Sequence, residues 1–157
     1  MKDRARPLVA VILLLMSCRH ARRETVLFMC PHGGAKSLIA ASYFNRMAAE
    51  KNLPFTAVAV AADDPYESVP APIADLLERD GFDVRSFKPR PVTSTDLRSA
   101  SKVIAVGCDL TKLDTQGTVV QEWNDVPMAS DDLPASAAAI RKHVITLIDQ
   151  IRRGNWR

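Results

Sequence analysis

Residues 26–37 read Val-Leu-Phe-Met-Cys-Pro-His-Gly-Gly-Ala-Lys-Ser, and this stretch decides the fold. An apolar run ends at Cys30, a glycine-containing turn follows, and apolar or small residues then recur with helical spacing through residues 38–50. The pattern predicts a buried strand, a loop and a helix. The Cys30 thiol would face the N–H groups of the loop and the positive end of the helix, which together form an anion site. The same field favours a thiolate, so Cys30 is a candidate nucleophile.

Composition narrows the class of protein. The chain has 157 residues, 47% hydrophobic and 25% charged, which is typical of one globular domain with a substantial core. Its net charge is +3, of which residues 1–18 supply +2. No basic stripe with interleaved aromatic residues is present, so we expect no nucleic-acid partner. The three cysteines form no zinc-ligand spacing, so we expect neither a metal site nor a cofactor.

The first 23 residues have the layout of an export signal. A basic start precedes an apolar run over residues 8–16, and Ser17-Cys18 follows. This resembles a bacterial lipoprotein signal, in which Cys18 would carry a lipid anchor to the membrane of the cell envelope. The arginines at 19, 22 and 23 oppose translocation and favour a cytoplasmic protein with an unexported leader. In either case we expect a leader over residues 1–23 and an α/β domain over residues 24–157.

Strands and helices alternate along the rest of the chain. Such alternation predicts an α/β fold with an open parallel sheet of four strands, or five, between two layers of helices. The expected strands are 24–29, 55–61, 84–87, 102–106 and 118–122. The expected helices are 37–51, 70–79, a short helix through residue 100 capped by residues 93–96, and 135–153.

Three segments are expected to converge at one edge of this sheet. Ligands of open α/β sheets bind at the carboxyl ends of the strands. Residues 30–37, the loop that begins at Gly107-Cys108, and residues 123–132 all follow expected strands. Tyr66, Phe87 and Trp123 are candidates for the side chains that surround the pocket.

The order strand, Cys30, five residues, a basic residue and Ser37 resembles the low-molecular-weight protein tyrosine phosphatase family, which includes the thioredoxin-coupled arsenate reductases. The resemblance covers about residues 25–153 and implies a sheet order of 2-1-3-4. It implies that Cys30 attacks phosphorus or arsenic, that Ser37 hydrogen-bonds the thiolate, and that an aspartate from a late loop protonates the leaving group. It also implies an oxyanion-binding loop made of Pro31, His32, Gly33, Gly34, Ala35 and Lys36.

The chain departs from this family within the loop. Lys36 stands where the family has arginine, and a lysine offers a point charge instead of a planar fork for two oxygens. The family's usual loop asparagine is missing. His32 is expected either to pair with the thiolate or the oxyanion, or to face solvent. The loop also differs from a nucleotide P-loop, because its first glycine is only three residues before the lysine.

The late aspartate has several candidates. Asp125, in Trp123-Asn124-Asp125-Val126-Pro127, is the closest match to the family's Asp-Pro and is our candidate for the general acid. The alternative is that the carboxylates of this segment cap the final helix. Asp132 precedes Pro134, a residue common in the first helical turn.

Cys108 lies where the arsenate reductases have a second cysteine that forms a disulfide with the first. In the expected sheet, the strand before Cys108 lies two positions from the strand before Cys30. At about 4.8 Å per strand the Cα atoms would begin roughly 10 Å apart, beyond the ~7 Å limit for a disulfide. The pair would then join only through loop movement, and the alternative is that Cys108 is a small buried residue.

Three functions are therefore expected, with the first favoured. The chain would be a cysteine-dependent phosphatase-like hydrolase that forms a phosphocysteine on a phosphorylated protein, through phosphotyrosine, or on a small phosphomonoester. It would alternatively be an arsenate reductase-like oxidoreductase that uses Cys30 and Cys108. The third alternative is a non-catalytic oxyanion-binding module.

Overall fold

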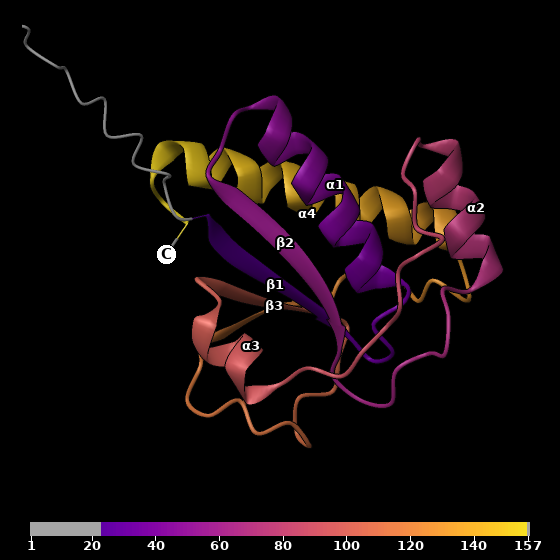
Figure 1. The fold of residues 1–157 in the computed structure, drawn as a ribbon, viewed down its shortest axis with the longest axis horizontal. Helices are drawn as coiled ribbons and strands as arrows, with labels where there is room; N and C mark the ends of the chain where they lie inside the picture. The colour runs from indigo at the N-terminus through magenta and orange to yellow at the C-terminus, as the bar shows by residue number, and fades with distance from the viewer. Residues whose placement is uncertain (1–22, 157) are drawn as a thin grey trace, which may run out of the picture.

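The computed structural model describes residues 23–156, which form a parallel four-stranded sheet flanked by helices (Figure 1). The expected leader and Cys18 lie outside the described residues. In the described part of the chain no helix is both long and apolar enough to cross a membrane. The elements in chain order are β1 (Glu24–Cys30), α1 (Lys36–Glu50), β2 (Phe55–Ala61), α2 (Ala71–Arg79), α3 (Ser94–Ser99), β3 (Lys102–Val106), β4 (Val120–Trp123) and α4 (Leu133–Arg153).

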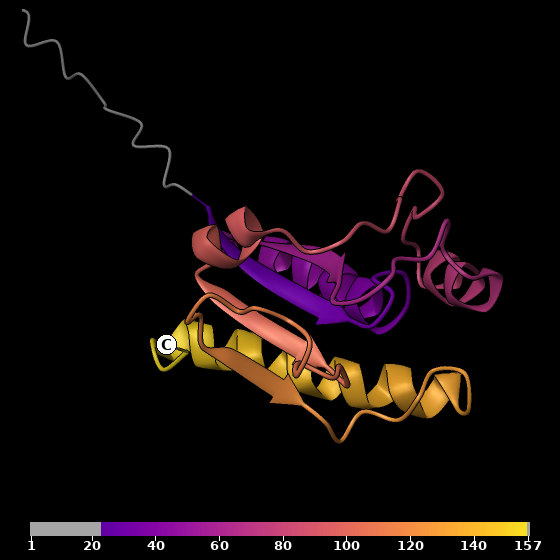
Figure 2. The same ribbon diagram turned by 90° about the horizontal axis from the view of Figure 1, so that it is seen from below.

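The sheet order is β2-β1-β3-β4 with every pair parallel, as the family resemblance implied. β1 is paired on both sides, so its backbone is satisfied by β2 and β3 along its length. All of its residues from Val26 to Cys30 are buried. The carboxyl ends of the strands point toward the same edge (Figures 1 and 2), and this edge carries the loops that follow Cys30 and β3.

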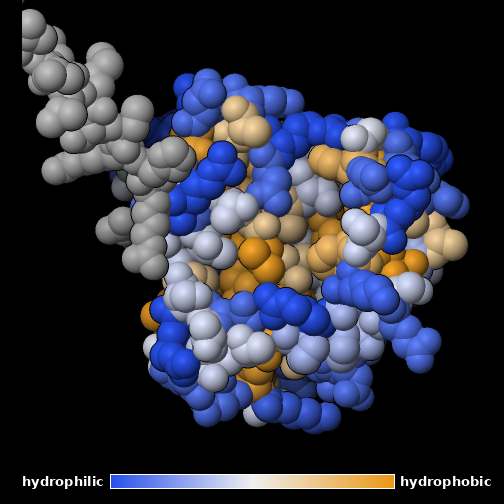
Figure 3. All heavy atoms as spheres, in the orientation of Figure 1, coloured by the Kyte–Doolittle hydropathy of each residue, from blue (hydrophilic) through white to orange (hydrophobic). Residues whose placement is uncertain are grey.

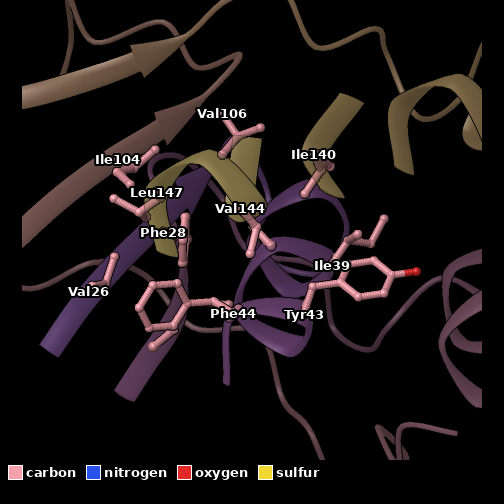
Figure 4. Close-up of a cluster of buried hydrophobic side chains, with 14 of the residues drawn as sticks. Val26, Phe28, Ile39, Tyr43, Phe44, Ile104, Val106, Ile140, Val144 and Leu147 are labelled. Atoms are coloured by element: carbon pink, nitrogen blue, oxygen red, sulfur yellow. The ribbon is translucent and has the colours of Figure 1, made fainter. Parts of the chain in front are cut away.

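Alternate side chains of β1 enter two different cores. Val26 and Phe28 pack with side chains of α1 and α4, which cover one face (Figure 4). Leu27 and Met29 pack with Leu97 of α3 on the other face. The period of two therefore divides an unbroken apolar strand between two helical layers. Figure 3 shows hydrophilic residues over much of the outer surface, with hydrophobic residues in the middle of that view.

The expected strand at residues 84–87 is wrong. This segment is a turn in which the Phe87 N–H donates to the Val84 carbonyl oxygen at 3.1 Å. Val84 and Phe87 are three residues apart, so in a strand they would point to opposite faces. In the turn Val84 is buried in the core that α1 and α4 share, and Phe87 packs against the same core. The sheet consequently has four strands in the described residues, and β3 is the direct neighbour of β1.

The core between the sheet and α4 gives a direct stability prediction. Leu147 of α4 is 2% exposed, whereas Ile145, two residues before it, is 46% exposed. We expect Leu147→Ala to lower the free energy of unfolding by about 2–5 kcal/mol, because it leaves a cavity. Ile145→Ala is the matched control and should change it by about 0.5 kcal/mol. Urea unfolding measures both, and equal losses would show that the two faces of α4 are assigned incorrectly.

Candidate active site

Cys30 is the last residue of β1 and its thiol contacts a buried hydroxyl. The Cys30 Sγ lies 3.0 Å from the Ser37 Oγ, and the two residues are 2% and 0% exposed. Ser37 occupies the first turn of α1, so the helix fixes its side chain against the end of the strand. The sulfur therefore lies beside both a hydroxyl and the positive end of the α1 dipole. The strand–loop–helix unit therefore brings together Cys30 and Ser37, as the sequence indicated.

The loop between β1 and α1 is oriented by hydrogen bonds from the segment that follows β2. The carbonyls of Cys30, Pro31 and His32 accept hydrogen bonds from the N–H groups of residues 62, 63 and 66. Those carbonyls point toward the segment that follows β2. Because the peptides are trans, their N–H groups point away from that segment. No side chain caps the N-terminus of α1, and its first turn contains no acidic residue. The N–H groups of the loop and of the first turn of α1 therefore remain open to an anion. Pro31 is the exception: it has no N–H, so the expectation that it helps to bind an oxyanion is wrong for its backbone.

Gly33 is required by the close approach of β2. Its φ is +70°, and a Cβ at this position would lie 2.7 Å from the backbone nitrogen of Ala61. A side chain would therefore meet backbone that cannot move without disturbing the sheet. The glycine allows the loop to fold against the end of β2.

The loop borders a small pocket of about 130 Å³. Two sides of it come from the cysteine loop and the segment after β2, and a third side from the loop between β4 and α4. None of the described residues that line it carries a carboxylate. The lining residues are Cys30, Pro31, His32, Ala35, Lys36, Tyr66, Met128, Ala129 and Ser130.

Lys36 brings a positive charge to this pocket. It is 4% exposed, and its Nζ lies 3.5 Å from the Gly107 carbonyl oxygen and 4.0 Å from the Met128 Sδ. Within the described part of the chain it forms no ion pair. A buried cation with two weak partners is incompletely compensated, so an entering anion gains a strong partner. A Cβ on Gly107 would lie 2.4 Å from this Nζ, so glycine leaves the room that the ammonium occupies.

His32 is held by the segment that follows β2. Its Nδ1 lies 2.7 Å from the Asp64 carbonyl oxygen, and its ring packs against Tyr66 with a centroid distance of 4.6 Å. Because a carbonyl oxygen only accepts, Nδ1 carries the hydrogen in this contact. In the neutral ring Nε2 is then an acceptor. His32 borders the pocket, and its ring forms no hydrogen bond with the Cys30 sulfur in the described structure.

Asp125 is not brought to the pocket. Its carboxylate oxygens lie 2.8 and 3.0 Å from the Nε2 of His143 on α4, and its side chain is 71% exposed. His143 in turn stacks on Trp123 at 4.7 Å and 15°. The hydrogen bond from His143 lowers the pKa of Asp125, whereas a general acid needs a raised one. The geometry therefore does not support Asp125 as the acid, since its carboxylate contacts α4 and does not line the pocket.

Other residues of this loop have structural roles. Asp132 accepts a hydrogen bond from the Ala135 N–H at 2.9 Å and caps α4, as the alternative interpretation expected. Asp131 accepts from the hydroxyl of Ser130 at 3.0 Å. Met128, Ala129 and Ser130 were not identified from the sequence. Their segment was expected at this edge, but which of its side chains reach the pocket has no local sequence signal.

Of the three suggested pocket aromatics, only Tyr66 lines the pocket. The ring of Trp123 lies tilted against Phe28, with centroids 5.5 Å apart, and stacks on His143, with centroids 4.7 Å apart. Phe87 packs against the core that the sheet forms with α1 and α4.

Cys108 is nearer to Cys30 than the sequence indicated. The expected separation of two strands is wrong, because β3 pairs directly with β1 and places Ala105 opposite Met29. Cys30 and Cys108 belong to one cluster of buried side chains, and both thiols are free. Burial, followed by the charge of Cys30, raises the pKa of the Cys108 thiol to about 12. Cys108 also borders a second pocket, of about 260 Å³, on another side of Pro31.

This raised pKa predicts a loss of stability in alkali. An unfolded thiol ionises near 9.0, whereas folded Cys108 stays protonated to about 12. Between those values the unfolded state binds fewer protons, so stability falls as the pH rises. We expect a loss of roughly 2–3 kcal/mol from pH 9 to pH 11 in urea titrations. Cys108→Ala should flatten this slope, and an unchanged slope would contradict the assignment.

Comparisons with known proteins agree with this architecture. No family model matches the chain. A Halobacterium salinarum protein named "Putative arsenate reductase" is 23% identical over 97 residues, which are 61% of this chain and 68% of that protein.

Solved structures of two enzyme classes superpose on the chain. A thioredoxin-dependent arsenate reductase of Corynebacterium glutamicum matches with a TM-score of 0.72 and 19% identity over 85% of this chain; the chain spans 64% of that protein. Low-molecular-weight phosphatases of Vibrio cholerae and Streptococcus pyogenes match with TM-scores of 0.69 and 0.66 and identities of 16% and 14%. They cover 83% and 81% of this chain and 98% and 92% of their own. The chain therefore has the fold shared by the low-molecular-weight protein tyrosine phosphatases and the arsenate reductases.

Proposed function

We propose that this protein is a cysteine-dependent enzyme of tetrahedral oxyanions, and that its substrates are phosphomonoesters, with phosphotyrosine among them. The observation that carries the proposal is the buried contact of the Cys30 thiol with the Ser37 hydroxyl at an uncapped helix N-terminus. The buried Lys36 in the same pocket adds a positive charge for an oxyanion. Solved structures with this fold include phosphatases and arsenate reductases, which supports the same class of chemistry.

In the proposed reaction Cys30 attacks phosphorus as a thiolate. An S–P bond forms, the P–O bond to the organic group breaks, and a phosphocysteine results. The loop N–H groups and the Lys36 ammonium stabilise the charge on the non-bridging oxygens. Water then attacks phosphorus and releases inorganic phosphate and the thiolate. The small pocket holds the phosphoryl group, and the organic group lies at its rim, where Tyr66 and Met128 are 39% and 53% exposed.

The missing carboxylate determines which esters react. None of the described lining residues is an acid that can protonate the leaving oxygen. The departing alkoxide or phenoxide must therefore carry its own negative charge or take a proton from water. A positioned general acid typically contributes about 10²–10⁴-fold, and this contribution matters most for weakly acidic leaving groups. The proposal thus favours aryl over alkyl phosphates.

We expect the full chain to hydrolyse 4-nitrophenyl phosphate at least about 100-fold faster than an alkyl phosphate, because only the former leaves readily without an acid. Steady-state release of inorganic phosphate measures both rates. Cys30→Ser should abolish turnover, whereas Cys108→Ser is the matched cysteine control and should retain it.

Activity that persists in Cys30→Ser would overturn the proposal. Lys36→Arg tests the remaining alternative, a non-catalytic oxyanion-binding module, because the planar guanidinium restores binding of two oxygens. If neither wild type nor Lys36→Arg turns over but both bind phosphate, the protein is an oxyanion-binding module.

A second candidate is arsenate reduction, and the position of Cys108 favours it. The strand before Cys108 is the immediate neighbour of β1, and the two cysteines share a buried cluster. In this reaction Cys30 attacks arsenate with loss of water, and Cys108 then attacks the Cys30 sulfur. A disulfide forms while arsenic(V) takes two electrons and leaves as arsenite. The raised pKa of Cys108 slows this step, because the thiol must lose its proton to attack.

For this candidate we expect arsenate to produce a Cys30–Cys108 disulfide with release of one arsenite per chain. Peptide mass spectrometry under non-reducing conditions identifies the bridge, and phosphate in place of arsenate is the control. Neither Cys30→Ser nor Cys108→Ser should form it. Arsenate exposure that leaves both thiols free would exclude arsenate reduction while leaving the phosphatase proposal intact.

A further inference from the structure

Met128 places an oxidisable sulfur beside the cation of the pocket. Its Sδ lies 4.0 Å from the Lys36 Nζ, and the residue is 53% exposed. We propose that Met128 is a modification site: a peroxide converts its thioether to the sulfoxide, whose oxygen binds the Lys36 ammonium and suppresses oxyanion binding. This inference rests on the proposed function for the site and adds a way in which that reaction is regulated.

Met128 is the accessible methionine of the described chain. Met29, on β1, is 0% exposed, and Met47 packs partly buried against the core of α1 and α4. A peroxide in solution can therefore reach the sulfur of Met128 and not that of Met29. The reaction transfers one peroxide oxygen to sulfur: the thioether loses two electrons, the O–O bond breaks, and water or an alcohol leaves. The product is reversible through methionine sulfoxide reductases.

The Lys36 ammonium is positioned to donate a hydrogen bond to the new oxygen. A thioether is a weak acceptor, and the Gly107 carbonyl oxygen is 3.5 Å away, so neither present partner is a strong hydrogen bond. In the described chain no carboxylate pairs with Lys36. A sulfoxide oxygen one bond length from Sδ comes within hydrogen-bond distance of the ammonium. Among the described residues Lys36 has no other strong acceptor, and a hydrogen bond from a cation to this oxygen is a strong one.

The backbone holds Met128 at this position. Its carbonyl oxygen accepts hydrogen bonds from the N–H groups of Asp131 and Asp132, both at 3.1 Å. Asp125 on one side of it is bonded to His143, and Asp132 on the other side caps α4. The oxidised side chain is thus kept beside the pocket. Because the pocket is only about 130 Å³, the added oxygen occupies the space and the donor that an oxyanion would use.

The test treats the full chain with dilute hydrogen peroxide and then with dithiothreitol, which reduces cysteine sulfenic acids and disulfides and leaves methionine sulfoxide unchanged; only protein whose Cys30 and Cys108 are both recovered as free thiols is compared. Peptide mass spectrometry should show oxidation at Met128 and none at Met29. Calorimetric titration with inorganic phosphate should then show at least about tenfold weaker binding, the loss expected when a charged hydrogen-bond donor is taken. Turnover of 4-nitrophenyl phosphate should fall with it, and methionine sulfoxide reductase should restore both.

Two variants separate this mechanism from general damage. Met128→Leu removes the sulfur at similar volume, and its phosphate binding should be unaffected by peroxide after dithiothreitol. Met128→Gln places an amide oxygen near the position of the sulfoxide oxygen, and should weaken phosphate binding without peroxide. Loss of binding in oxidised Met128→Leu equal to that in wild type would overturn the proposal, as would Met128 oxidation that leaves phosphate binding unchanged.

A direct view of Lys36 keeps this test independent of the proposed function. The ¹⁵N resonance of the Lys36 ammonium, assigned with Lys36→Arg, should move on oxidation and its hydrogens should exchange more slowly. If the unoxidised protein neither binds phosphate nor turns over, the proposed function fails, and this resonance still decides whether the sulfoxide captures Lys36. An unchanged resonance in a protein oxidised at Met128 overturns the inference.

Discussion

Backbone hydrogen bonds between the segments that follow β1 and β2 extend beyond the end of the sheet, and the site depends on them. Cys30 is in register with Ala61, and N–H groups at residues 62, 63 and 66 donate to the carbonyls of Cys30, Pro31 and His32. The segment that follows β2 therefore orients the peptide groups of the loop. An anion site made of backbone donors needs such fixed peptides, because free ones would turn their N–H groups toward water.

A second constraint is the burial of a cation without an ion-pair partner in the described chain. Lys36 lies at the N-terminus of α1, and its ammonium occupies the space that a side chain on Gly107 would fill. Three segments thereby meet around one charge: the cysteine loop, the turn after β3 and the loop before α4. Burying a charge costs free energy unless something compensates it, and here the strongest compensation available is a bound anion. On the same reasoning, we expect a change at Met128 to alter anion binding in the pocket.

Several elements could be predicted from local patterns alone. The strands at 55–61 and 102–106 lie where they were expected, and α1 begins one residue earlier than expected. The capping pattern at residues 93–96 correctly predicted α3, whose N-cap Thr93 and Asp96 exchange hydrogen bonds. These succeed because short apolar runs and capping residues act locally. Residues 84–87 fail for the opposite reason: Val84 and Phe87 are apolar because they contact a distant core, and within the described residues this segment joins no strand of the sheet.

By itself the sequence determined the strand–loop–helix unit of the candidate site: Cys30, the loop, Lys36 and Ser37 lie within eight consecutive residues whose spacing fixes a strand end and a helix start. Only the tertiary structure decided what surrounds that unit. It turned Met128 toward Lys36 and Asp125 toward His143, although the two residues are three apart in one loop. It also placed Cys108 one strand from Cys30 instead of two. The physical reason is that side chains on a loop after a strand have no periodic pattern, so long-range contacts choose which of them reaches the pocket.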